Sequence, residues 1–262
     1  MLGFFKSKPL LKEEDYIFQI ETYKWLLKHF GESAFYEETQ LVLPNKEFFP
    51  EKYESVEDAA NGTFKKVKKF AGLEEWPCKL IAQEEDINPV IAPTIVLQNS
   101  PVSPNGTFEF KSESEILITY NPAIVSNPTY LVSTYAHELA HYLTGTAPVE
   151  PPGGWENWEF ATDIAATFMG FGIFMANSSF NFSQHSGVDF QGWKSNRSGY
   201  LSEPEHCMAL ALFLMLKSCP IESVTKYLKA NLKKMLHKAL KDISNSNVIQ
   251  QLKEIEFEQV YS

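Results

Sequence analysis

The first half of the sequence combines stretches of helical hydrophobic spacing with short apolar runs. Apolar residues recur every three or four positions in residues 12–30, 55–70 and 128–144. This spacing predicts three helices with a buried face. Pro128 fits the first turn of the third helix, with Ser126 or Asn127 as its cap, and Gly145 follows its last turn.

Short runs rich in β-branched and apolar residues, separated by prolines, predict strands. These runs are residues 40–43, 79–82, 91–97, 108–110 and 115–121. Because the last run ends at Pro122, we expect it to lie near a sheet edge, beside the helix at 128–144. The strands predict a small mixed sheet in the N-terminal part.

The second half of the sequence has mostly helical patterns. A helix rich in small residues begins near Glu159. Residues 208–216 are apolar on all sides, which predicts a buried helix, and residues 221–243 predict a long amphipathic one. Residues 177–199 predict a polar, aromatic loop. We expect one α+β domain with two lobes: residues 1–145, which carry the sheet, and a helical lobe of residues 146–262.

Composition and charge narrow the class of protein. With 44% hydrophobic and 21% charged residues, the chain has the composition of a globular protein. Its net charge of −10 argues against nucleic acid or an anionic membrane as the main partner. The three cysteines form neither a metal-binding spacing nor a disulfide framework. Because neither a secretory signal nor a transmembrane run is recognisable, we expect a cytoplasmic protein.

The helix at 128–144 contains the pattern H-E-x-x-H at His137, Glu138 and His141. Residues four apart lie on one face of a helix, so the two imidazoles can bind one cation, and Glu138 can take a proton from a water on it. The alternative is a helix with two exposed histidines and no metal. A chain with 6 histidines would contain this pattern by chance roughly 0.01 times, which favours the metal site.

Two histidines do not complete a catalytic zinc site, which usually has three protein ligands and a water. One known extension of the motif places a glycine and a third histidine after the second. In this sequence those positions are Thr144 and Ala147, so the third ligand must come from elsewhere.

A carboxylate on the next helix is the remaining source of a third ligand. Glu159 follows His141 by eighteen residues, and Asp163 lies one turn later on the same face. Asp163 suits a hydrogen bond to a ligand histidine, which such histidines usually make. Two alternatives remain: Glu156 or Asp163 as the ligand, and an ordinary buried helix whose N-terminus favours the charge of Glu159.

The combination of His137, Glu138 and His141 with Glu159 and Asp163 resembles the gluzincin, or thermolysin-like, group of zinc metallopeptidases. The resemblance extends over residues 117–172. It implies a zincin-like fold in which His137, His141 and Glu159 bind Zn²⁺, Glu138 is the general base and Asp163 orients a ligand histidine. It also implies a peptide or protein substrate that lies along an edge strand at the rim of the cleft.

Gluzincins usually carry a further histidine or tyrosine that stabilises the oxyanion. The candidates are Tyr200, His206 and His185, and we favour Tyr200, which precedes a predicted helix start. Two other functions remain open: a catalytically inactive scaffold that binds a protein partner, and a zinc hydrolase that acts on a non-peptide amide. The presence of Glu138 argues against the scaffold, because a structural zinc needs no base.

Overall fold

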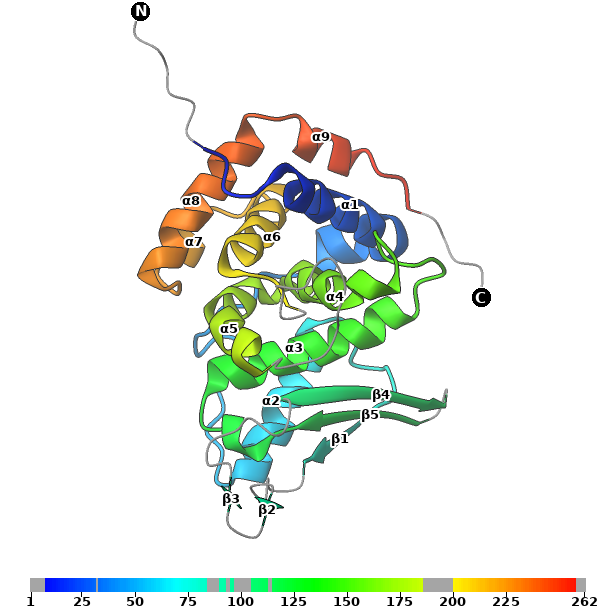
Figure 1. Ribbon diagram of the computed structural model, residues 1–262, viewed down its shortest axis with the longest axis vertical. Coiled ribbons are helices and arrows are strands. Elements are labelled where there is room, and N and C mark those ends of the chain that lie inside the picture. Colours follow the sequence, from blue (N-terminus) through cyan, green and yellow to red (C-terminus); the bar gives the residue numbers. More distant parts are fainter. Residues whose placement is uncertain are drawn as a thin grey trace, which may run out of the picture.

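The computed structural model describes residues 8–31, 33–83, 90–92, 95–96, 105–112, 115–185 and 200–257. Helix α3 (Pro128–Gly145) crosses the middle of the molecule, with a small sheet on one side and most of the other helices on the opposite side (Figure 1). Helix α2 (Val56–Phe70) packs against α3 on the side of the sheet. Buried residues from both sides join one hydrophobic core. The fold is a mixture of helices and a small sheet, as predicted.

The main sheet has three strands in the order β1-β5-β4. Strand β1 (Lys79–Ala82) pairs in parallel with β5 (Glu115–Tyr120), and β4 (Gly106–Ser112) pairs with β5 in the antiparallel sense. The sheet is therefore mixed, as expected. A separate antiparallel pair, β2 (Val90–Ala92) and β3 (Ile95–Val96), occupies the segment predicted as one strand.

The predicted position of residues 115–121 at a sheet edge is wrong. Strand β5 is central, and β4 forms the edge beside α3 (Figure 1). Pro122 lies two residues after the end of β5 and begins a short 3-10 turn (Pro122–Ile124), so it removes no hydrogen bond from the ladder. The buried side chains of Ile116, Leu117 and Ile118 fit a central strand.

Helix α3 ends within one residue of the prediction. The side chain of Asn127 accepts a hydrogen bond from the backbone N–H of Tyr130 at 3.3 Å, and Pro128 occupies the first turn. Every residue from Leu131 to Thr144 is buried. The H-E-x-x-H motif therefore lies on a helix that protein surrounds on nearly all sides.

The other helices lie mainly on the side of α3 opposite the sheet (Figure 1). Helix α4 (Trp158–Ala166) contacts α3, and a π-helical turn (Thr167–Phe171) connects it to α5 (Gly172–His185). Within this turn Gly170 has φ +100°, and a Cβ atom there would collide with the backbone carbonyl of Gln40. The helices are α1 (Glu13–Phe30), α4 (Trp158–Ala166), α5 (Gly172–His185), α6 (Glu203–Leu216), α7 (Glu222–Thr225), α8 (Ala230–Ser244) and α9 (Val248–Lys253).

Tertiary hydrogen bonds account for two further differences from the prediction. Residues 40–43 form no strand, and the N–H of Val42 donates to the carbonyl of Gly170 instead. The predicted helix at 221–243 is interrupted between α7 and α8. There the side chain of Asn177 donates to the carbonyl of Tyr227 at 2.9 Å and accepts from the N–H of Lys229 at 3.2 Å, which replaces helical hydrogen bonds.

The segment predicted as a loop, residues 177–199, begins inside helix α5, and residues 186–199 lie outside the described part of the chain. Helix α6 is buried, as predicted. In the described chain, one helical stretch, Trp155–Ser179, is long and apolar enough to cross a membrane. Its most apolar window is 94% buried inside the protein, which is typical of a core helix.

Candidate metal centre

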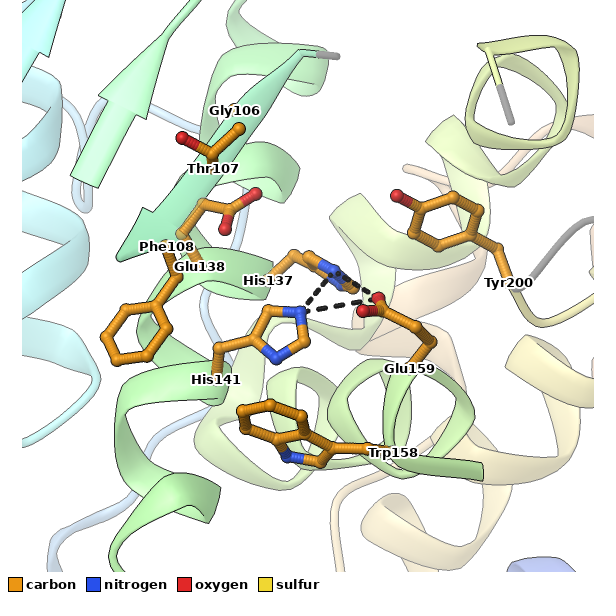
Figure 2. A pocket seen from close by; sticks show the side chains of 9 residues that line it. All are labelled: Gly106, Thr107, Phe108, His137, Glu138, His141, Trp158, Glu159 and Tyr200. Carbon is orange, nitrogen blue, oxygen red and sulfur yellow. Dashed lines mark hydrogen bonds and ion pairs between the residues drawn. The ribbon is translucent and has the colours of Figure 1, made fainter. Parts of the chain in front are cut away.

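Three side chains from two helices converge on one point. His137 and His141 come from successive turns of α3, and Glu159 comes from the first turn of α4 (Figure 2). The Nε2 atoms of the two histidines are 3.1 Å apart. Oε2 of Glu159 lies 3.3 Å from each of them. Both histidines are buried, whereas 47% of the Glu159 side chain is exposed.

The spacing of these three atoms fits a small divalent cation. Ligands about 2.0–2.1 Å from a tetrahedral zinc ion lie roughly 3.3 Å from one another. The observed separations of 3.1 to 3.3 Å therefore leave one position at bonding distance from all three atoms. His137, His141 and Glu159 form a group that could hold a metal ion.

The buried carboxylate of Asp163 fixes the orientation of His137. Its Oδ1 lies 2.9 Å from Nδ1 of His137, and its Oδ2 accepts the backbone N–H of Leu201 at 2.9 Å. Because a carboxylate only accepts, Nδ1 of His137 carries the proton and Nε2 presents its lone pair to the centre. This contact between Asp163 and a candidate ligand histidine is the one predicted from the sequence.

The ring of His141 has a hydrogen-bond partner that the sequence analysis missed. Oγ1 of Thr162 lies 3.3 Å from Nδ1 of His141, so both rings turn Nε2 toward Glu159. Thr162 lies three residues after Glu159 on α4, and this helical spacing was the available signal.

The charge balance of the centre favours a cation. Burial lowers the pKa of His137, but hydrogen bonds to Asp163 and Glu159 outweigh it and hold that pKa well above its usual value. Burial likewise raises the pKa of Glu159, but its bonds to His137 and His141 hold that pKa well below the usual range. The carboxylates therefore attract positive charge to the position between the imidazoles.

Glu138 lies in the same pocket, under strand β4. Its side chain is 5% exposed, and burial raises the pKa of its carboxyl, while His137 and His141 act in the opposite direction. The close approach of β4 requires Gly106, since a Cβ there would lie 2.9 Å from the carbonyl of Thr119 and 3.0 Å from Oε1 of Glu138. A raised pKa suits a carboxylate that must exchange protons.

Of the three oxyanion candidates, Tyr200 lines the pocket. Its ring centroid lies 5.4 Å from that of His137, and it faces the centre from the side opposite Glu138 (Figure 2). Burial and the neighbouring carboxylates raise its pKa, so its hydroxyl stays protonated. His206 is buried behind Asp163, with Nε2 3.7 Å from Oδ2. The side chain of His185 lies outside the described part of the structure.

Two aromatic residues that the sequence analysis did not single out enclose His141. Phe108 of β4 stacks on its ring at 6.2 Å, and Trp158 meets it edge-on at 4.7 Å. The indole N–H of Trp158 donates to Oγ1 of Thr144 at 2.8 Å. The pocket has a volume of about 300 Å³ and is lined by Gly106, Thr107, Phe108, His137, Glu138, His141, Trp158, Glu159 and Tyr200.

The alternative third ligand Glu156 is exposed and lies outside the group of three donors.

Comparison with known proteins adds no family. No protein-family model, curated protein or solved structure matches this chain.

Proposed function

We propose that this chain is a zinc-dependent metallopeptidase with a zincin-like fold. The convergence of His137, His141 and Glu159 at 3.1 to 3.3 Å, with Glu138 in the same pocket, supports this proposal best. Two imidazoles and one carboxylate are a known ligand set of catalytic zinc in peptidases. In this proposal each residue has the role that the resemblance to gluzincins implies.

An open coordination position distinguishes a catalytic zinc from a structural one. Among the described residues, the group contains three donors, one short of a closed tetrahedral site. Asp163 is not a fourth ligand, because its two oxygens already bind His137 and Leu201. A solvent molecule can therefore complete the site, which favours the enzyme over the inactive scaffold.

When bound, zinc would polarise the scissile carbonyl and lower the pKa of a water molecule. Glu138, buried beside the imidazoles, takes the proton from the attacking water and passes it to the leaving amine. Tyr200 reaches the centre from the opposite side, and its protonated hydroxyl donates to the oxyanion. Asp163 and Thr162 keep both imidazoles aligned throughout.

Strand β4 supports a peptide as the substrate. The hydrogen bond from Asn121 to the carbonyl of Asn105 fixes the pattern of the ladder with β5. In that pattern, the backbone groups of Gly106 and Phe108 point away from β5. Both residues line the pocket, and no strand of the described chain pairs with this edge. An extended peptide can hydrogen-bond to it beside the metal.

Metal content and peptide cleavage test this proposal together. The wild type, Glu159→Ala and Glu156→Ala are purified, and their zinc is measured by elemental analysis. Each protein is then incubated with a mixed peptide library, and new termini are identified by mass spectrometry. We expect near-stoichiometric zinc and cleavage in the wild type and in Glu156→Ala, and loss of both in Glu159→Ala.

Glu156 is a matched control because it is an exposed glutamate one helical turn before Glu159. Zinc that remains bound in Glu159→Ala would move the third ligand elsewhere and contradict the proposed site. Stoichiometric zinc without cleavage of any peptide would favour the non-peptide amide hydrolase or the scaffold.

A further inference from the structure

An aromatic cluster extends from the metal centre at the end of the pocket where His141 lies. Phe108 and Trp158 contact the ring of His141, and Trp155 meets Trp158 edge-on at 5.2 Å. In Figure 2, Phe108 and Trp158 lie around His141, at the end away from Tyr200. The pocket therefore has one aromatic end, beside His141, and Tyr200 lies at the other end.

Trp155 is not used by the hydrophobic core. Trp155 is 46% exposed and lies in a 3-10 turn (Trp155–Asn157) directly before α4. An exposed indole next to a pocket offers apolar surface that a bound side chain can cover, and covering it is favourable. Because the indole N–H of Trp158 already binds Thr144, this tryptophan offers its ring to a ligand. At Trp158 and Phe108 the cluster therefore offers apolar surface rather than hydrogen-bonding groups.

The direction of β4 determines which part of a bound peptide reaches this cluster. Along β4, Gly106 lies over Glu138, and Phe108 lies over His141. A peptide that pairs in the antiparallel sense, the more stable one, runs from Phe108 toward Gly106. Residues on the amino side of the scissile bond then lie at the aromatic end.

We propose that Trp155, Trp158 and Phe108 form a subsite for an aromatic or large aliphatic side chain on the amino side of the scissile bond. The proposal rests on the peptidase function and names its substrate class. Trp155 is the specificity-determining residue of this subsite, because its exposed ring is available to a ligand. The recorded ring contact of Trp155 is with Trp158 and not with one of the three candidate metal ligands, so Trp155 can be changed without altering the metal group.

Metal-anchored probes test the subsite without requiring hydrolysis. N-acetyl-phenylalanine hydroxamate and N-acetyl-alanine hydroxamate extend from the metal toward the amino side of the site. Succinyl-type hydroxamates with a benzyl or methyl group extend toward the carboxyl side. Their affinities for the zinc-loaded wild type, Trp155→Ala, Trp155→Phe and Ile81→Ala are measured by calorimetry. Ile81→Ala is the control, because Ile81 is a 45% exposed apolar residue on β1.

We expect the wild type to bind the phenylalanine probe about 10-fold more tightly than the alanine probe, the strength of one aromatic contact. Trp155→Ala should lose this preference with its zinc affinity unchanged, and Trp155→Phe and Ile81→Ala should keep it. Equal binding of both probes, or a preference unaffected by Trp155→Ala, would overturn the subsite. A preference for benzyl over methyl that appears only in the succinyl-type hydroxamates would also overturn the subsite. If the wild type prefers the phenylalanine probe but cleaves no peptide, the peptidase function is rejected and the aromatic binding site is retained.

Discussion

The carboxylate of Asp163 and the imidazole of His137 are joined by a buried hydrogen bond of 2.9 Å. The second carboxylate oxygen accepts the N–H of Leu201, the residue next to Tyr200. One side chain therefore holds the ring of a candidate metal ligand and the backbone that carries Tyr200. Asp163 therefore connects His137 to the segment that carries Tyr200.

Asp163→Asn should weaken metal binding. The carboxylate faces two N–H donors, and an amide has one oxygen, so it can satisfy only one of them. We expect zinc affinity to fall by about 10- to 100-fold, measured by competition with a chromophoric chelator. Asp242→Asn is the control, because Asp242 accepts the N–H of Leu10 at 2.8 Å on α8, away from the site. Equal affinities of the two variants would contradict the role of Asp163.

Glu138→Gln should abolish turnover and leave zinc bound. The amide keeps the shape of the side chain but cannot accept the proton of the attacking water. We expect kcat to fall by at least about 10²- to 10⁴-fold, the contribution of a general base. The measurement is the rate of peptide cleavage with zinc content determined on the same sample, and Glu156→Gln serves as the control. Normal turnover in Glu138→Gln would reject this assignment.

The same substitution should change how the stability of the metal-free protein depends on pH. Burial raises the pKa of Glu138 above its usual 4.5, despite the opposing effect of His137 and His141. The folded state then binds this proton more tightly than the unfolded state, so stability falls as pH rises from 4.5 through the raised pKa. In a chelator, Glu138→Gln should melt above the wild type at pH 7, and the difference should shrink toward pH 4. A difference that does not vary with pH would contradict this.

Tyr200→Phe should lower the rate of the chemical step. The substitution removes only the hydroxyl that we place at the oxyanion, so kcat should fall by about 10²- to 10³-fold. KM and zinc content should change little. Tyr142→Phe is the control, since the hydroxyl of Tyr142 donates to the carbonyl of Pro77 at 3.2 Å. The measurement is kcat and KM of both variants on one peptide. Equal kcat values would exclude Tyr200 as the residue that stabilises the oxyanion.

Gly106→Ala should destabilise the protein and disturb Glu138. The added Cβ would lie 2.6 Å from a methyl carbon of Thr134 and 2.9 Å from the carbonyl of Thr119, so β4 must move away from α3. We expect a loss of about 1–3 kcal/mol in the free energy of unfolding, measured by denaturant titration. Gly145→Ala places its Cβ 3.7 Å from Trp158, an ordinary contact, and should not destabilise. An unchanged free energy of unfolding in Gly106→Ala would show that β4 does not pack this closely against α3.

Local patterns were enough to predict the elements that carry the candidate ligands. The spacing in α3 places His137 and His141 on one face, and the spacing from Glu159 to Asp163 does the same on α4. These relationships depend on helix geometry alone. The metal that the group binds and the reaction remain predictions.

Features that depend on tertiary contacts were not predictable from local patterns. The central position of β5 depends on which strand pairs with its other side. The break between α7 and α8 depends on Asn177, which is distant in sequence from Tyr227. The contact of Leu201 with Asp163 is of the same kind, because a backbone N–H carries no signal in the sequence. Such contacts appear only when the helices are placed in space.

The three candidate ligands also lie close together along the chain, between His137 and Glu159. Only the short connection between α3 and α4 has to close for them to meet, and short loops close fast and at low entropic cost. Tyr200 joins later, because it belongs to the segment that leads into α6. A folding chain therefore needs only the α3–α4 hairpin to bring the three candidate ligands together. A metal ion bound there would act as a template on which the rest of the pocket assembles.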